Sequence, residues 1–468
     1  MTNSFNPVCA VSVPHPPLII PQIGRGQEKE IQATIDAYRR AAGFIAGHHP
    51  DTVIVITPHT VMYSDYNHIS PGVAASGNFG RYRAKDVKIY AEYDAELIGA
   101  ICAECAGRDI SAGTEGERDM SLDHGTMIPL WFMREACGGK LPFSVVRVGL
   151  SGLPLREHYR LGMAIKAAAD RLGRRIAVIA SGDLSHRLRE DGPYGYNESG
   201  PVYDEMIMSA LGSADFGALF GFKAKLCREA GECGHKSFTV MAGAFDGTAV
   251  KAEKLSYEGP FGVGYGVCTF EPIGYDDSRR FLDGEEKRGR DELAARRAAE
   301  DEYVRLARKS LETYIKDGRV IDIPDGIPSD LISRRAGAFV SLHKDGNLRG
   351  CIGTIYPVCL SLAQEIIDNA VSAGTRDPRF PPVKESELED LEYSVDVLGD
   401  PEDIPDESQL DVRRYGVIVT SGYRRGLLLP NLDGVDTVQD QISIARQKAG
   451  IKDGEPIKLQ RFEVVRHF

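Results

Sequence analysis

Long apolar runs are missing from this chain of 468 residues. No stretch comes near the ~20 consecutive apolar residues that a membrane-spanning helix requires. Residues 1–13 also lack the basic and then apolar pattern of a secretion signal. We therefore expect a cytoplasmic protein that has no membrane partner.

Cysteine is scarce as well. The chain has nine cysteines, an odd number, and they are scattered along it. This density is too low for a disulfide scaffold and agrees with a reducing compartment. One Cys-x-x-Cys pair, Cys102 and Cys105, lies in a segment with helical character, residues 94–106. A zinc site of this type needs a second pair, so we interpret these cysteines as small buried side chains.

An excess of basic residues is missing too. The chain has 56 Lys and Arg against 68 Asp and Glu, a net charge of −12. A negative field attracts neither nucleic acid nor an anionic membrane, so we expect no nucleic-acid partner. We also find no internal repeat and no low-complexity tract.

The length and the apolar patterning indicate two domains. A single core rarely grows past roughly 250–300 residues, and 42% hydrophobic residues are enough for two cores. In the first part, short β-branched runs at residues 53–57, 144–148, 176–181 and 262–269 alternate with helical patterns at 28–47, 94–106, 155–172 and 202–212. Strand–helix alternation predicts an α/β domain with a mixed or mostly parallel sheet flanked by helices.

A charged stretch separates this domain from a smaller one. Residues 275–302 are nearly all charged residues and alanine, so we expect domains at 1–273 and 291–468 with a linker at 274–290. The second domain should open with a helix that continues through residues 303–315. Short strands at 338–343, 394–398, 416–420 and 426–429, with helices at 360–373 and 437–449, predict an α+β domain.

Four histidines of the first domain lie in turns rich in proline or glycine. His15 follows the run 8–13, His59 follows 53–57, His186 follows 176–181, and His124 lies in SLDHGTM. In an open α/β sheet, sites form beyond the carboxyl ends of the strands. These turns therefore predict either a shared metal site or hydrogen-bonded histidines at one sheet edge.

The ordered set SVPHPPLI, TPHT, DHG-x-x-PL and GDLSH resembles the LigB-like superfamily, over roughly residues 6–272. That superfamily includes the class III extradiol dioxygenases and the Memo proteins. The resemblance implies that His15 and His59 bind a metal. It places the third ligand in EAGECGHKSF, where Glu232 would complete a two-His, one-carboxylate triad suited to Fe(II). Cys233 is the alternative ligand, as in the Memo branch, and its soft thiolate would favour another metal such as Zn or Cu.

The resemblance also implies catalytic roles. His186 matches the acid–base histidine, which titrates near neutral pH and can move a catechol proton. Asp183 is a candidate to orient that ring, or else caps the following turn. His124 matches a histidine near the open metal positions, where we expect it to hydrogen-bond to oxygen or substrate. His48, His49 and His68 are expected to be exposed, and His235 is a less favoured substitute ligand.

The second domain contains NLRGCIGTIYP and RDPRFPPV, which are similar to the AMMECR family over about residues 291–468. Gly350 and Gly353 around Cys351 predict a tight turn with either an exposed thiol or a buried cysteine. Cys351 lies with Arg349, Arg376, Asp377 and Arg379 among polar residues that would suit a small anion or a protein partner. The resemblance to the AMMECR family implies no particular activity.

Three functions follow from these resemblances. The first is an extradiol dioxygenase-like oxidoreductase that acts with O₂ on a catecholic or related small aromatic substrate. The second is a Memo-like metal-binding or redox protein that works with a radical-SAM partner, an association known for these families, without ring cleavage. The third is a non-catalytic module that recruits a partner through the AMMECR domain. The sequence leaves the oligomeric state open.

Overall fold

A computed structural model describes residues 5–344, 346–432 and 434–468. The chain divides into two compact units, residues 1–287 and 288–468, and each is described by itself. Among the described residues, no helix has the length and apolar character needed to cross a membrane.

The first unit is built on a six-stranded sheet in the order β7-β2-β8-β1-β10-β9. The strands are β1 Cys9–Val13, β2 Thr52–Thr57, β7 Ser144–Gly149, β8 Ile176–Ser181, β9 Thr248–Glu258 and β10 Tyr265–Tyr275. The four strands β7, β2, β8 and β1 are parallel, whereas β10 and β9 are antiparallel to their neighbours. The mixed sheet that the sequence predicts is therefore confirmed.

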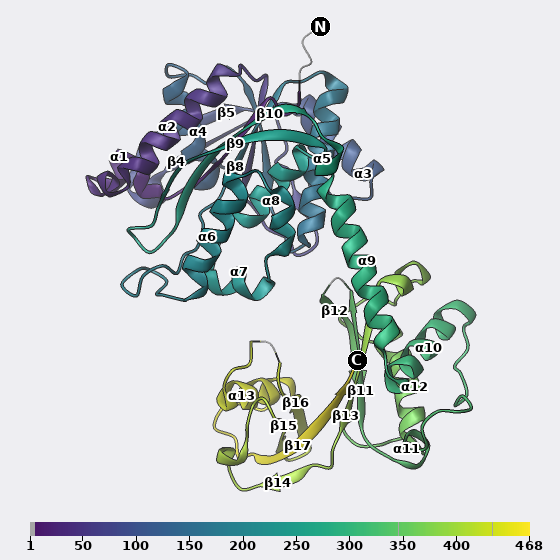
Figure 1. The fold of residues 1–468 in the computed structure, drawn as a ribbon. Coiled ribbons are helices and arrows are strands. Elements are labelled where there is room, and N and C mark those ends of the chain that lie inside the picture. Colours follow the sequence, from purple (N-terminus) through teal and green to yellow (C-terminus); the bar gives the residue numbers. More distant parts are fainter. Residues whose placement is uncertain (1–4, 345, 433) are drawn as a thin grey trace. The chain divides into compact units, whose positions relative to one another are not determined.

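Helices cover both sides of these strands (Figure 1). Their bounds are α1 Pro21–Gly24, α2 Gln32–Gly47, α3 Ala95–Gly107, α4 His124–Ala136, α5 Leu155–Leu172, α6 Ser199–Gly212, α7 Ala224–Ala230 and α8 His235–Ala244. Helix α2 packs against α4, and α5 packs against both α3 and α8. Strands β2, β8 and β1 are buried along their whole lengths, because helices cover both faces of a parallel sheet.

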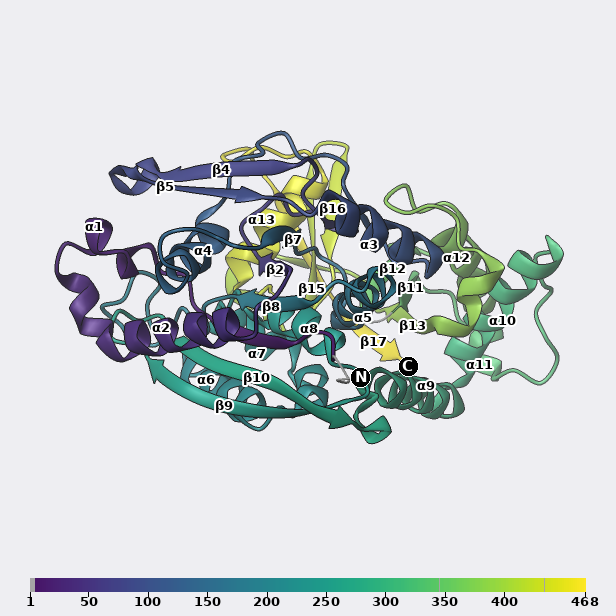
Figure 2. The same cartoon turned by 90° about the horizontal axis from the view of Figure 1, so that it is seen from above.

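A hairpin stands beside the main sheet. It pairs β4 Ala74–Phe79 with β5 Ala84–Glu92, and a short parallel pair joins β3 Asn67–His68 to β6 Ala112–Gly113. Figure 2 shows the hairpin running alongside α4. The sequence patterns did not identify this hairpin or strand β9, because both alternate polar and apolar residues rather than forming an apolar run.

The predicted linker contains regular structure. Strand β10 runs to Tyr275, and helix α9 Phe281–Ala299 spans much of the charged stretch. The boundary between the compact units, after Lys287, falls inside that helix. The segment is thus helical from Phe281 rather than irregular, and the predicted domain limits stay a prediction.

The second unit has an antiparallel sheet in the order β12-β11-β13-β17-β15-β16, with β14 also paired to β17. The strands are β11 Ala338–Lys344, β12 Asn347–Gly353, β13 Leu391–Leu398, β14 Glu402–Ile404, β15 Tyr415–Ser421, β16 Arg424–Leu428 and β17 Lys458–His467. The helices are α10 Glu302–Asp317, α11 Ser329–Ser333, α12 Leu362–Thr375 and α13 Val438–Lys448. Helices α10 and α12 cover one end of the sheet and α13 the other, so the α+β prediction is confirmed.

Candidate metal centre

Three of the predicted residues follow neighbouring parallel strands. His15 lies just beyond β1, His59 beyond β2, and Asp183 beyond β8, which lies between the other two in the sheet. The carboxyl ends of parallel strands meet at one edge. The fold therefore brings together residues that lie far apart in the sequence.

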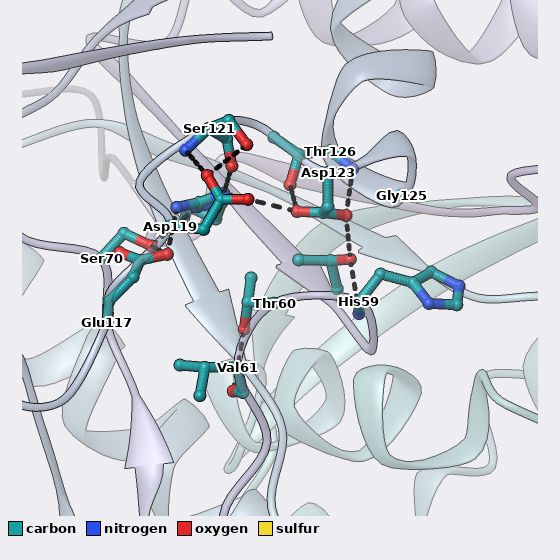
Figure 3. Close-up of polar contacts among 12 residues, drawn as sticks. His59, Thr60, Val61, Ser70, Glu117, Asp119, Ser121, Asp123, Gly125 and Thr126 are labelled. Atoms are coloured by element: carbon teal, nitrogen blue, oxygen red, sulfur yellow. Dashed lines mark hydrogen bonds and ion pairs between the residues drawn. The ribbon is translucent and has the colours of Figure 1, made fainter. Parts of the chain in front are cut away.

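The histidine rings meet at this edge. Ring centroids are 4.6 Å apart for His15 and His59, 4.1 Å for His59 and His124, and 5.4 Å for His15 and His124. The candidate ligand atoms of these three residues all lie within 4.8 Å of one another. The His59 ring points away from the acidic residues Glu117 and Asp119 (Figure 3).

The hydrogen bonds of His15 decide which ring nitrogen carries the proton. The hydroxyl of Ser181 donates to the carbonyl oxygen of Gly125 at 2.7 Å, so its oxygen accepts from His15 Nδ1 at 2.9 Å. The proton of a neutral His15 is then on Nδ1, and Nε2 presents a lone pair. His15 Nε2 faces His59 Nε2 at 2.9 Å.

A thiol completes a second group of candidate ligands. Cys233 Sγ lies 3.6 Å from His15 Nε2 and accepts a hydrogen bond from the backbone N–H of Asp183 at 3.3 Å. His15, Asp183 and Cys233 form the second cluster of candidate ligand atoms within 4.8 Å of one another. The contact needs glycine on both sides, because a Cβ on Gly182 would lie 2.1 Å from the Cα of Gly234.

The two pair distances at His15, one to His59 and one to Cys233, fit metal coordination, whereas His59 and Cys233 belong to different clusters of candidate ligand atoms. Metal–nitrogen bonds of about 2.1 Å and metal–sulfur bonds of about 2.3 Å place two ligand atoms roughly 3–3.6 Å apart around one ion. The measured separations are 2.9 Å between the nitrogens and 3.6 Å from nitrogen to sulfur. Burial lowers the pKa of His15 well below its ordinary value and also lowers that of His59. Neutral imidazoles, the form that binds metal, are therefore favoured.

Glu232 is not brought into either cluster, although the sequence favours it as the third ligand. Its Oε2 accepts a hydrogen bond from the backbone N–H of His235 at 2.7 Å, and burial raises its pKa to about 7. The ring of His235 is directed to the carbonyl oxygen of Leu219 at 2.9 Å. Cys233, the alternative, is the neighbouring residue that reaches His15. Which of these two adjacent residues faces His15 depends on how the backbone turns before α8. The ligand chemistry of the two residue types does not determine that turn.

Asp183 supports His15 rather than the His186 ring. Its Oδ1 accepts a hydrogen bond from the backbone N–H of His15 at 2.7 Å, and among the described residues no hydrogen bond joins it to the ring of His186. Burial raises the pKa of Asp183 to about 6. The role in orienting His186 that the sequence offered is therefore not seen.

His186 stands beside the cluster with a ring nitrogen available. Its Nε2 is buried and has no hydrogen-bond partner among the described residues, while the ring stacks on Tyr194 with centroids 5.1 Å apart. Burial lowers the pKa of His186 below its ordinary value. A neutral ring with an unused nitrogen can accept a proton from a bound molecule.

His124 differs from its predicted setting because it begins helix α4 rather than following a strand. Asp123 caps that helix and accepts hydrogen bonds from the backbone N–H of Thr126 at 3.0 Å and the hydroxyl of Thr57 at 2.8 Å (Figure 3). A side-chain acceptor at the N-cap fixes the first turn of a helix. The ring of His124 is thereby held next to His59, in reach of a ligand bound there.

A buried ion network behind this turn was missed in the sequence. His68, expected to be exposed, is fully buried and lies 3.1 Å from Glu117. Arg147, also buried, donates to Glu117 at 2.5 Å and lies 3.6 Å from Asp123. Buried charges require partners, so a lone arginine within the apolar run 144–148 was the available signal.

In the second unit, the polar groups around Cys351 form hydrogen bonds and ion pairs with neighbouring residues of the same unit. Cys351 lies in strand β12, not in a tight turn, and Ser341 lies 3.2 Å from its sulfur. Asp377 accepts from the backbone N–H of Cys351 at 2.9 Å and from the guanidinium of Arg379 at 2.6 Å. Arg349 is paired with Glu387 at 2.9 Å.

The glycines of this motif serve packing. A Cβ on Gly350 would lie 2.2 Å from the carbonyl oxygen of Ala373 in α12, and one on Gly353 would lie 2.3 Å from the ring of Phe339. Only glycine allows the helix and the neighbouring strand to approach this closely. Burial raises the pKa of the Cys351 thiol, which makes it a weak nucleophile.

Comparisons with known proteins cover both units. The family model described as the catalytic LigB subunit of aromatic ring-opening dioxygenase matches residues 9–268, and the AMMECR1 model matches residues 304–467. A protein of Clostridium acetobutylicum is 42% identical over 463 residues, which cover 97% of this chain and 98% of that protein. A protein of Thermotoga maritima is 52% identical over 170 residues, covering 36% of this chain and 98% of its own length. The crystal structure of an uncharacterized protein from Pyrococcus horikoshii matches 35% of this chain and 88% of that one, with 33% identity and a TM-score of 0.33.

Proposed function

This chain belongs to the family of the catalytic LigB subunit of aromatic ring-opening dioxygenases and carries an AMMECR1 domain after it, and on that premise we propose that its first unit is a metal-dependent oxidoreductase. The proposed substrate is a catecholic or related small aromatic molecule, with O₂ as the co-substrate. The observation that carries the proposal is the approach of both His59 and Cys233 to Nε2 of His15, at 2.9 Å and 3.6 Å.

These three side chains would hold the ion, with Fe(II) as the favoured metal. A divalent iron bound there supplies Lewis acidity towards the substrate oxygens and an electron source for O₂. Asp183 keeps His15 in place through its backbone N–H, and Ser181 fixes the tautomer of the same ring. Of these three side chains, His15 is buried, Cys233 is partly buried and His59 is exposed.

His186 is the proposed acid–base residue. Its unpartnered Nε2 accepts a phenolic proton from the bound ring and later returns it. His124, held by the capped turn at the start of α4, donates or accepts a hydrogen bond at the substrate on the other side of His59. Tyr194 stacks on His186 and restricts the rotation of that ring.

The test is anaerobic reconstitution of the full chain with Fe(II), followed by O₂ uptake over a panel of catechols. We expect uptake with at least one catechol, together with ring-cleavage absorbance. The variant His186→Gln should lower turnover by about 10²–10⁴-fold, the usual contribution of general acid–base groups, while metal content and thermal stability stay unchanged. Loss of metal in this variant would instead identify His186 as a ligand.

A second function is favoured by one observation, the place of Cys233 in the cluster. A thiolate ligand is softer than a carboxylate and suits Zn or Cu as well as iron. In this alternative the unit is a Memo-like metal-binding or redox protein that works with a radical-SAM partner and cleaves no ring. Fe(II)-loaded protein that consumes no O₂ with any catechol, but changes oxidation state with a one-electron oxidant, would support it over the first proposal.

A further inference from the structure

A large cleft adjoins the histidine cluster on one side. Its volume is about 1690 Å³, and His59 and His124 lie in its wall. The opposite wall is the hairpin of β4 and β5, which runs alongside α4 (Figure 2). Sites for drug-sized molecules usually measure about 300–1,000 Å³. The cleft is thus larger than a single aromatic ring needs.

The length of the cleft follows from helix α4. Its lining includes His124, the first residue of the helix, and Arg134, near its last turn. Ten residues of α-helix rise roughly 15 Å. A molecule that fills the cleft therefore extends from the histidine cluster to the far end of α4.

The acidic side chains of the cleft are mostly engaged by the protein. They are Glu92, Glu117, Asp119 and Asp123. Glu117 is paired with Arg147 and His68, Asp119 accepts from the backbone and hydroxyl of Ser121, and Asp123 caps α4. Glu117 and Asp123 therefore have a cationic neighbour in Arg147, and Asp119 has neutral hydrogen-bond donors.

The basic side chains of the cleft are mostly unengaged. They are Arg81, Lys88, Arg118, Arg134, Lys140 and Arg147. Within the described part of the chain, Arg81, Lys88, Arg118 and Lys140 have no acidic partner at ion-pair distance, in contrast to Arg147. The chain as a whole carries a net charge of −12, so a cleft with surplus positive charge differs from the average surface.

These cations have a definite order along the cleft. Arg81 lies at the tip of the hairpin, next to Tyr82, whose ring centroid is 5.7 Å from that of His124. At the other end, Arg134 donates to the backbone carbonyl oxygen of Lys88 at 2.8 Å, and Lys140 follows α4. Arg81 and Arg147 therefore lie near His124, whereas Arg134 and Lys140 lie at and after the last turn of α4, and Lys88 adjoins Arg134.

We propose that this cleft binds an elongated anionic aromatic molecule, with its ring at His59 and His124 and an acidic chain reaching Lys88, Arg134 and Lys140. The inference deepens the proposed function, since it takes the histidine cluster as the reacting end. The far-end charge is a phosphate or a carboxylate, because both accept hydrogen bonds from guanidinium and ammonium groups. Lys88 and Lys140 are then specificity-determining residues that lie away from the reacting atoms.

The test uses ligands that share one ring and differ only in the tail. Catechol is compared with the same ring carrying a hexyl phosphate, a hexanoate or a hexylammonium chain, by anaerobic calorimetry on the full chain with and without Fe(II). We expect either or both anionic tails to bind at least about tenfold tighter than catechol, the usual size of a charge-assisted hydrogen bond. The ammonium tail should bind no tighter than catechol, and the two anionic tails show which acid is preferred.

Matched variants locate the effect. The double variant Lys88→Gln/Lys140→Gln should lower the affinity for the better anionic ligand roughly tenfold and leave catechol binding unchanged. The control Lys85→Gln/Lys251→Gln removes the same charge from exposed positions outside the cleft lining and should change neither. Equal affinity for anionic and cationic tails, or equal losses in both double variants, would overturn the inference. The ranking of the ligands by affinity is measured without turnover. A protein that takes up no O₂ would therefore count against the proposed function alone.

Discussion

In the first unit, His15 Nε2 lies 2.9 Å from His59 Nε2 and 3.6 Å from Cys233 Sγ, whereas in the second unit Asp377 is surrounded by donors from Cys351 and Arg379. The first arrangement brings together imidazole and thiol groups that can bind a metal ion. The second is complete without any ligand. A motif of polar and glycine residues can therefore mark a candidate site in one unit and serve packing in the other.

The carboxyl groups of the two units show the same contrast. Burial raises the pKa of Asp183 to about 6 and that of Asp204 to about 7. The hydrogen bond from Arg379 instead holds the pKa of Asp377 well below its ordinary value. The first unit thus contains groups whose ionised form is unfavourable in the fold, and the second contains groups that the fold stabilises as anions.

The largest expected effect concerns Asp204, which is buried behind the His186 segment. It accepts from the backbone N–H of Ser185 at 2.7 Å and the hydroxyl of Tyr257 at 2.8 Å. Because its folded pKa is raised to about 7, its contribution to stability is present below pH ~4 and is lost as the pH rises through about 7. The free energy of unfolding of the wild type should therefore fall by roughly 2–4 kcal/mol between pH 4 and pH 8. In Asp204→Asn this fall should be absent.

The single tryptophan makes this measurement specific to the first unit. Trp131 lies in α4, so its fluorescence during urea unfolding follows that unit. Wild type and Asp204→Asn should differ in the slope of stability against pH. Parallel curves would show that Asp204 has an ordinary pKa and that the contrast between the units is smaller than described.

The next effect concerns Asp377 in the second unit. Asp377→Ala leaves the buried N–H of Cys351 without its acceptor and frees the guanidinium of Arg379, which should lower the free energy of unfolding of this unit by about 2–3 kcal/mol. Hydrogen exchange of β12 amides measures it. Asp390→Ala, which removes an exposed pair with Lys344, is the control and should cost about 1 kcal/mol or less. Equal losses of unfolding free energy in the two variants would show that Asp377 does not stabilise the segment around Cys351.

The smallest effect on stability is expected when a metal-site residue is replaced in the metal-free protein. His59→Gln should change the unfolding free energy of the metal-free protein by less than about 1 kcal/mol, because the residue is exposed and makes no ion pair with any described residue. Added metal should raise the stability of wild type by about 2.7 kcal/mol at a hundred times Kd, and this gain should disappear in the variant. A variant that keeps the gain would place the ion elsewhere.

Much of the first unit could be predicted because its central strands are continuously apolar. The runs before His59 and His186 identify β2 and β8, and the parallel order of the sheet places β1, which precedes His15, on the other side of β8 from β2. Strand β9 and the β4–β5 hairpin were missed because their alternating residues do not stand out from a polar surface. The cleft beside that hairpin was therefore not foreseeable either.

The details of the site depended on local backbone geometry. Glu232 and Cys233 are adjacent, and the backbone turns Cys233 towards His15 while Glu232 accepts from the backbone N–H of His235. His68 and Arg147 form a buried pair through Glu117, a contact between segments far apart in the sequence. In the second unit, Cys351 has the flanking glycines of a turn, yet they serve the packing of α12 and β11.

The identity of the third ligand tests the account most directly. The full chain is loaded anaerobically with Co(II), whose bond to a thiolate gives a charge-transfer band in the near ultraviolet, and Cys233→Ser and Glu232→Gln are compared with wild type. We predict one Co(II) per chain and a thiolate band in wild type and in Glu232→Gln, with the band lost in Cys233→Ser. A wild type without the band, or a Glu232→Gln protein that no longer binds the ion, would contradict a centre formed by His15, His59 and Cys233.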